Sequence, residues 1–251
     1  MKPICCAAKT DGEMMMVRFV VEEDFWSLFP QAKIGVVVCR GIDNSRRDVE
    51  VYEKLLREAE KEAGKFLQLE EFSSNPVIAV WREAFRKFKT KKGARCSIEA
   101  LLKRVKNNNP IGTINPLVDI YNSISLRYGL PCGGEDIDKF VGDLRLTKAT
   151  GSEPFLPLGE EENAPPHEGE IVYKDDAGAI CRCWNWREAQ RTMLAEETKN
   201  AFLCIELIDE TRSGEFHQAL KELAELVPRH LGGTSKVEVL DIHNREMTIL
   251  D

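Results

Sequence analysis

A change of pattern at Gly133-Gly134 constrains the fold of this 251-residue chain more than any other feature. Before it, apolar residues recur mostly at helical spacing; after it, short runs alternate or are continuously apolar, as in strands. With 43% apolar residues, the chain is long enough to bury a sizeable core in one large domain or two closely packed ones. Helices from the first half and strands from the second must share that core.

The first half contains two strand-like runs, one short helix and four longer predicted helices. The strands are expected at residues 16–21 and 33–39, with a short helix at 22–29 between them. Asp43, Asn44 and Ser45 offer caps for a long amphipathic helix. Asn75-Pro76 opens the next helix, Ser97 caps a third that reaches about Lys106, and Asn115-Pro116 opens a fourth that ends at Gly129.

The second half is predicted to be mainly β. Strands are expected at 143–147, 170–174, 179–184 and 201–208, with a hairpin turn at 175–178, a helix over 216–227 and a closing strand at 236–242. Residues 1–16 are expected to be a disordered start. We interpret residues 17–251 as a single domain, with 17–94 as an N-terminal subregion and 95–251 as the core that carries a pocket.

Charge is distributed unevenly along the chain. There are 35 basic and 42 acidic residues, which give a net charge of −7. Residues 82–106 nevertheless contain ten basic and two acidic residues, whereas residues 153–176 contain eight acidic and one basic residue. The basic cluster, much of it expected on the solvent face of a helix, is suited to a phosphate backbone. The alternative is two solvated surfaces of opposite sign.

The remaining composition excludes several classes of protein. No apolar run approaches the ~20 residues that a membrane helix needs, and no phosphate-binding glycine loop or hydrolase elbow is present. The eight cysteines include no Cys-x-x-Cys pair, and only four histidines accompany them. We therefore expect reduced thiols in the cytoplasm, with no metal, no cofactor and no membrane partner.

Two polar clusters are candidate sites. Asn115, Asp119 and Asn122 fall on one face of a predicted helix, where the alternative is a solvated stripe. Residues 184–192 follow a predicted strand and combine two Trp with two Arg, which suit stacking of a ring and binding of a carboxylate or phosphate. The alternative there is core Trp with surface Arg.

These same residues resemble the B3/B4 module of the bacterial phenylalanyl-tRNA synthetase β chain, which edits mischarged tRNA. Ile114-Asn-Pro-Leu-Val-Asp-Ile-Tyr-Asn122 is similar to the module's Ile-Asn-Asn-Val-Val-Asp-Ile-Thr-Asn, and the run to Gly129-Leu-Pro131 is similar to its Leu-Gly-Gln-Pro. Asp136-Ile-Asp-Lys139 and residues 170–206 extend the resemblance, which covers about 82–242. Gly133 stands where the module has a histidine, and the module's Gly-Gly-Glu glutamate falls on Glu188 or on Gln190.

The resemblance implies an α+β fold with a mixed sheet and packed helices, and a free-standing trans-editing hydrolase that cleaves the ester of a mischarged aminoacyl-tRNA. It implies the aminoacylated 3′ end of tRNA as partner, with oligomeric state open. We expect Glu188, kept ionised by two guanidiniums, and Thr192 as catalytic residues. The expected substrate-binding residues are Asn115, Asn122, Trp186, Arg187 and Arg191, and the expected tRNA-binding residues are Arg86, Lys89, Lys91, Lys92 and Arg95. Alternatives are a non-catalytic tRNA- or amino-acid-binding module and a scaffold for a protein partner.

Overall fold

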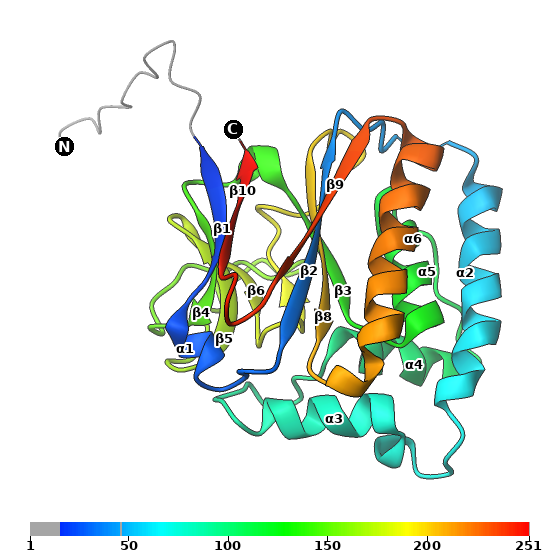
Figure 1. Cartoon of the computed structure of the whole chain (residues 1–251), viewed down its shortest axis with the longest axis horizontal. Coiled ribbons are helices and arrows are strands. Elements are labelled where there is room, and N and C mark those ends of the chain that lie inside the picture. Colours follow the sequence, from blue (N-terminus) through cyan, green and yellow to red (C-terminus); the bar gives the residue numbers. More distant parts are fainter. Residues whose placement is uncertain (1–15, 46, 251) are drawn as a thin grey trace.

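The computed structural model describes residues 16–45 and 47–250, and two β-sheets packed against each other form its centre (Figure 1). The first sheet has six strands in the order β10-β1-β4-β5-β6-β7. Only its β1–β4 pair is parallel, so the sheet is mixed. Its strands are β1 (Val17–Val21), β4 (Leu144–Lys148), β5 (Ile171–Asp175), β6 (Gly178–Arg182), β7 (Arg187–Glu188) and β10 (Glu246–Leu250).

The second sheet is antiparallel and has four strands in the order β3-β8-β2-β9. Its strands are β2 (Lys33–Arg40), β3 (Cys132–Asp136), β8 (Ala201–Leu207) and β9 (Thr234–Leu240). The helices α5 (Pro116–Tyr128) and α6 (Ser213–Leu231) pack on its outer side, and α2 (Val49–Ala63) packs on α5 (Figure 1). The remaining helices are α1 (Glu23–Trp26), α3 (Pro76–Phe85) and α4 (Ser97–Lys106). The expected α+β fold is confirmed.

Strand alternation divides the core into two parts. On β2, Val36 and Val38 belong to the cluster between the sheets, whereas Val37 and Cys39 belong to the cluster beneath the helices. Successive strand residues point to opposite faces, so a sheet that is buried on both sides reads as a continuous apolar run. The second sheet is therefore the middle layer of the molecule.

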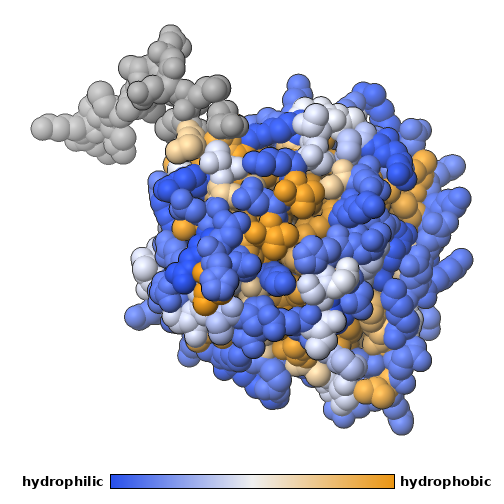
Figure 2. Space-filling model, in the orientation of Figure 1, coloured by the Kyte–Doolittle hydropathy of each residue, from blue (hydrophilic) through white to orange (hydrophobic). Residues whose placement is uncertain are grey.

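The surface agrees with this layering. In Figure 2 the outward faces of α2 and α6 are hydrophilic, and hydrophobic surface gathers where β10 and β9 diverge. Ile242 and Leu250 are partly buried against the core between the sheets. No helix among residues 16–45 and 47–250 is long and apolar enough to cross a bilayer.

The two subregions expected from the sequence are interleaved. Residues 17–94 supply β1 to the first sheet and β2 to the second, and both strands lie between strands from the later part of the chain. This interleaving favours one domain over two. The expected disordered start lies almost entirely in residues 1–15, outside the described residues.

Several local expectations are corrected by the structure. Helix α3 ends at Phe85, so Lys89, Lys91 and Lys92 lie in the following loop and not on a helical face. Cys96 is the N-cap of α4, and Ser97 is the first residue of the helix. The strand at 234–240 does not close the fold, because β10 follows it. Strand β3 was not expected, because its glycine pair resembles a loop.

Candidate functional site

A cavity of about 270 Å³ lies between the two sheets. Strands β3 and β8 of the second sheet form one wall, and β5, β6 and β7 of the first sheet form the other. The turn between β6 and β7 and the first residue of α4 border the cavity. The residues that line it are Ser97, Cys132, Gly133, Gly134, Glu135, Leu158, Tyr173, Cys181, Trp184, Asn185, Trp186, Arg187, Glu188, Phe202, Cys204 and Glu206.

Register and alternation direct side chains of β8 and β3 into this cavity. Phe202, Cys204 and Glu206 occupy alternate positions of β8, on the face turned to the first sheet. Gly133 pairs with Cys204, and a Cβ at Gly133 would lie 3.7 Å from the Cys204 Sγ and 3.9 Å from the Glu188 Oε1. The missing side chain at 133 therefore leaves space next to Glu188.

The turn at residues 183–186 orients the two Trp rings differently. Cys183 and Trp184 both have left-handed backbone conformations, with φ of 46° and 64°, which are strained for residues of this size. The Trp184 ring is fully buried and packs against Phe29 and Trp81, at centroid distances of 4.6 and 4.9 Å. Trp186 is only partly buried. The strained turn thus fixes one ring in the core and leaves the other at the rim.

Three carboxyl groups line the cavity, and burial raises the pKa of each. The pKa of Glu188 and that of Glu206 rise to about 7. The pKa of Glu135 lies well above its ordinary range, because burial and then the neighbouring charge of Glu188 disfavour its ionised form. Glu206 accepts hydrogen bonds from the Tyr173 hydroxyl at 2.6 Å and from the Asn185 amide. Uncharged carboxyls are therefore substantially populated near neutral pH.

Unpartnered polar atoms also collect here. Ser97 Oγ and the Asn185 Oδ1 are buried without a hydrogen-bond partner among the described residues. The Trp184 indole nitrogen and the Glu135 Oε2 also lack a partner in good hydrogen-bond geometry, although the indole faces Glu206 and the Glu135 carboxyl faces Thr192. All four residues line the cavity. A buried polar group without a partner costs about 1–3 kcal/mol. Such groups are explained when a bound molecule supplies the missing partners. The cavity therefore has the properties of a binding site for a ligand with several polar groups.

The chain matches a known family over most of the elements that build this cavity. Residues 80–232 match the family model described as the B3/4 domain. The chain belongs to the B3/4 domain family. The resemblance found at Ile114–Pro131 is thereby confirmed at the level of the family.

Comparison with individual proteins finds two similarities. A stretch of 73 residues, 29% of this chain and 9% of the relative, is 41% identical to the phenylalanine–tRNA ligase beta subunit of Mycoplasmoides gallisepticum. An N-terminal fragment of the phenylalanyl-tRNA synthetase beta subunit from Pyrococcus horikoshii aligns over 92% of this chain and 52% of the fragment, with 13% identity and a TM-score of 0.42. The chain thus spans about half of that fragment and about a tenth of the bacterial subunit.

The structure brings only some of the predicted site residues together. Trp186, Arg187 and Glu188 line the cavity, whereas Asn115, Asn122, Arg191 and Thr192 are not among the lining residues. Asn115 caps α5 by accepting from the Val118 N–H at 3.1 Å, and its amide donates to the Leu194 carbonyl. Asn122 is half-buried on the same helix.

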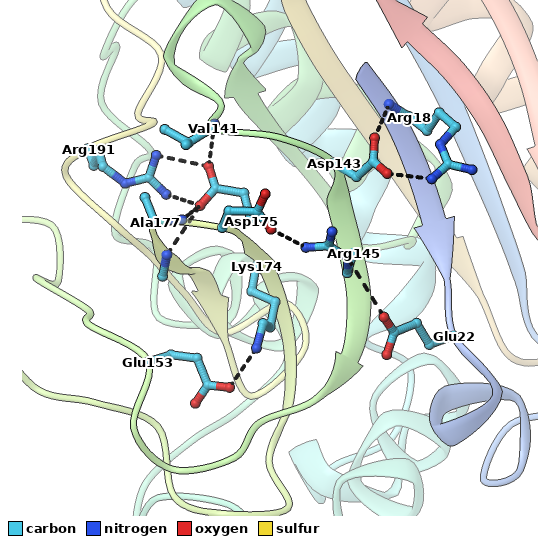
Figure 3. A network of polar contacts seen from close by, with 12 residues as sticks. Arg18, Glu22, Val141, Asp143, Arg145, Glu153, Lys174, Asp175, Ala177 and Arg191 are labelled. Atoms are coloured by element: carbon cyan, nitrogen blue, oxygen red, sulfur yellow. Dashed lines mark hydrogen bonds and ion pairs between the residues drawn. The ribbon is translucent and has the colours of Figure 1, made fainter. Parts of the chain in front are cut away.

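The expectation that two guanidiniums keep Glu188 ionised is wrong. Arg187 forms an ion pair with Glu160 at 2.7 Å. Arg191 forms a two-pronged pair with buried Asp175, at 2.6 and 3.0 Å (Figure 3). Because both cations have other partners, burial dominates at Glu188 and raises the pKa of its carboxyl. Thr192 is fully buried, and its hydroxyl has no hydrogen-bond partner among the described residues.

Sequence reasoning missed most of the cavity wall. Glu135 and Glu206 lie on strands, and in a sequence each reads as one more acidic residue. A signal was present in β8, where Glu206 interrupts the apolar run Ala201–Leu207. A glutamate inside a strand that is buried on both faces requires a partner or a function. Among residues 16–45 and 47–250, no group of His, Cys, Asp or Glu side chains is placed to hold a metal ion.

Proposed function

We propose that this B3/4 domain binds the aminoacylated 3′ end of a tRNA and hydrolyses the ester of a mischarged amino acid. The observation that carries the proposal is the convergence of Ser97, Glu135, Trp184 and Asn185, with unpartnered polar atoms, on a cavity that also holds Glu188. The cavity volume of about 270 Å³ suits a compact ligand such as an aminoacyl group. A second, hydrolytic pocket is needed because one binding pocket discriminates a methylene by only ~1–3 kcal/mol.

Glu188 is the proposed general base. Its pKa of about 7 lies near the operating pH, where a carboxylate removes a proton most effectively and its acid form returns one. The carboxylate takes a proton from water while the water oxygen bonds to the acyl carbon. The bond from that carbon to the ribose oxygen then breaks, and the proton passes from Glu188 to this oxygen. The products are the free amino acid and the tRNA hydroxyl.

The other proposed residues surround this reaction. Trp186 forms a wall, and Arg187 contacts phosphate. Asn115, Asn122 and Arg191 stay proposals as residues that position the substrate. Thr192 stays a proposed catalytic residue, and its hydroxyl faces the carboxyl of Glu135. The loop after α3 carries the remaining proposed contacts to tRNA, from Arg86, Lys89, Lys91, Lys92 and Arg95. The backbone N–H of Lys91 contacts the Cys183 thiol and lowers its pKa, although burial has the larger effect and raises that pKa to about 12. This loop therefore lies against the turn that holds Trp184 and Trp186.

A non-catalytic tRNA- or amino-acid-binding module is the second candidate. It is favoured by Gly133, which leaves the cavity without the histidine of the resembling synthetase module. Thiol chemistry is not an alternative, because burial raises the pKa of Cys181 and that of Cys204 well above the ordinary range. The cytoplasm stays the proposed location, supported by the six described cysteines, which are all free.

Deacylation of a panel of mischarged tRNAs tests the proposal. Glu188→Gln is expected to abolish deacylation while leaving the fold and the affinity for tRNA nearly unchanged. The matched control is Glu160→Gln, which alters an exposed carboxyl paired with Arg187. An active wild type together with an equally active Glu188→Gln variant rules out the general base. A wild type that binds aminoacyl-tRNA without cleaving any member of the panel supports the binding module instead.

A further inference from the structure

A second hollow adjoins the cavity and is separated from it by one side chain. This hollow, the α4 groove, has a volume of about 370 Å³. Trp186 borders both the cavity and the α4 groove. The other main residues of the groove are Arg95, Lys103, Arg104, Asn107 and Asn109. A ligand that fills the cavity and continues past Trp186 therefore enters the α4 groove.

The lining of the α4 groove is cationic. It contains three basic and no acidic side chains. Among the described residues, Arg95 and Lys103 have no ion-pair partner, and Arg104 donates only to the Pro110 carbonyl at 2.6 Å. The end of α4 contributes about half a negative charge, which the three whole positive charges outweigh. The groove is thus suited to an anion with more than one charge.

Nearby cations outside the groove are already neutralised in part. Arg82 forms a salt bridge with buried Glu99 at 2.6 Å, and Arg86 pairs with Glu83. Arg95 and Lys103 lie between that region and the α4 groove, because they border a hollow on each side. Their charges are available to a ligand, whereas the charge of Arg82 is committed to the fold.

Trp186 supplies a flat face between the cationic groove and the cavity with its carboxyls. The ring is partly exposed, and the Arg187 guanidinium lies 5.9 Å from its centroid. Partly exposed aromatic rings beside cationic grooves bind single-stranded nucleic acids by stacking their bases and attracting their phosphates. A free phosphate or an acidic peptide would use the cations without needing the ring.

We propose that the α4 groove binds the single-stranded sugar-phosphate chain next to the acylated ribose, and that Trp186 stacks on a base of that chain. The proposal rests on the proposed function, which places the aminoacyl group in the cavity. It assigns phosphate binding to Lys103 and Arg104, in addition to Arg95. The binding free energy then has two contributions, one from the charges and one from stacking on Trp186. These two contributions respond differently to salt.

The test uses the full chain and a short, non-acylated single-stranded RNA, with affinity measured between 50 and 200 mM salt. Each phosphate contact on a single strand contributes about −0.7 to the slope of log K against log salt. Lys103→Ala is expected to make the slope shallower by about that amount. The control is Lys221→Ala, which removes an equally exposed lysine from α6 and is expected to leave the slope unchanged. Equal slopes for these two variants would overturn the proposal.

The stacking role of Trp186 is tested by a loss of affinity that does not depend on salt. Trp186→Ala is expected to weaken RNA binding roughly tenfold at every salt concentration, with an unchanged slope. Trp186→Phe should restore most of the affinity, because it keeps an aromatic face and the packing of the turn. Unaltered affinity of a folded Trp186→Ala variant would overturn the stacking role. Because the RNA carries no aminoacyl ester, these outcomes are independent of deacylation. The groove proposal therefore stands or falls separately from the hydrolase proposal.

Discussion

The two faces of the four-stranded sheet are built from the same strands and serve different purposes. On β8, Leu203, Ile205 and Leu207 face the helices and are at most 1% exposed. The intervening residues Cys204 and Glu206 face the cavity. On this strand, one side therefore carries apolar side chains in close contact, and the other carries Cys204 and Glu206 beside empty volume.

The difference shows how a buried site is made inside a small fold. Close packing on the helix face stabilises the sheet. This stabilisation offsets the cost of unpaired polar atoms and uncharged carboxyls on the opposite face of the same strand. A loop cannot hold three carboxyls in an apolar environment, because solvent would lower their pKa values. Alternation along a strand places both environments within one segment of seven residues.

The largest expected effect comes from truncating a residue on the helix face. Leu203→Ala should lower the free energy of unfolding by about 2–5 kcal/mol, because it creates a cavity in a fully buried cluster. Cys204→Ala should cost much less, because the Sγ atom already borders empty volume. Urea unfolding followed by circular dichroism measures both values. Equal losses for these neighbours would contradict the division between the faces.

The adjacent glycines of β3 provide a second comparison. A Cβ at Gly134 would lie 2.6 Å from the Leu203 Cδ2 and 3.0 Å from the Leu194 Cδ1, whereas a Cβ at Gly133 meets nothing closer than 3.7 Å. We expect Gly134→Ala to destabilise the fold by about 1–3 kcal/mol through overpacking. Gly133→Ala should leave the unfolding midpoint nearly unchanged and should weaken binding of a ligand in the cavity. Thermal unfolding of the two variants measures this difference. A clear loss of stability in Gly133→Ala would show that the space beside Gly133 is filled in solution.

The smallest expected effect is a pH dependence that belongs to the cavity face alone. Burial raises the pKa of Glu206 from its ordinary 4.5 to about 7, so the folded state holds a proton that the unfolded state releases between these values. The contribution of Glu206 to stability should therefore be fully present below pH 4.5, should fall as the pH rises through this window, and should level off above 7. Within this window, each pH unit lowers the free energy of unfolding by at most about 1.4 kcal/mol.

Glu206→Gln provides the check on this pH dependence. Removal of the titrating group at 206 should make the profile of unfolding free energy less steep between pH 5 and 8, while Glu188, whose pKa is also about 7, still contributes. The amide still accepts the Tyr173 hydroxyl, and Asn185 can turn its unpartnered Oδ1 toward the new NH₂ group. Glu160→Gln, at an exposed site, is the control. A profile that stays equally steep in Glu206→Gln would place the titrating group elsewhere.

The sequence predicted the elements well and the cavity poorly, and the physical reasons differ. Asn115-Pro116 and Gly129 define α5 through local rules, because a cap, a fixed φ and a left-handed residue act within one turn. Glu135 and Glu206 become site residues only when β3 pairs with β8 and both face the first sheet, which no local pattern encodes. The motif at 184–192 indicated the correct region, but the partners of Arg187 and Arg191 come from distant segments.

The pairing of β1 with β10 has a consequence for the order of folding. Residues 17–21 pair with residues 246–250, and β2 receives its second neighbour only when residues 234–240 are present. During synthesis, the apolar strand β2 therefore has an open edge until almost the whole described chain has left the ribosome, and open edges of this kind are prone to association with other chains. Contacts so distant in sequence also slow folding. The apolar edge of β2 thus has to stay shielded until residues 234–240 are available to complete the second sheet.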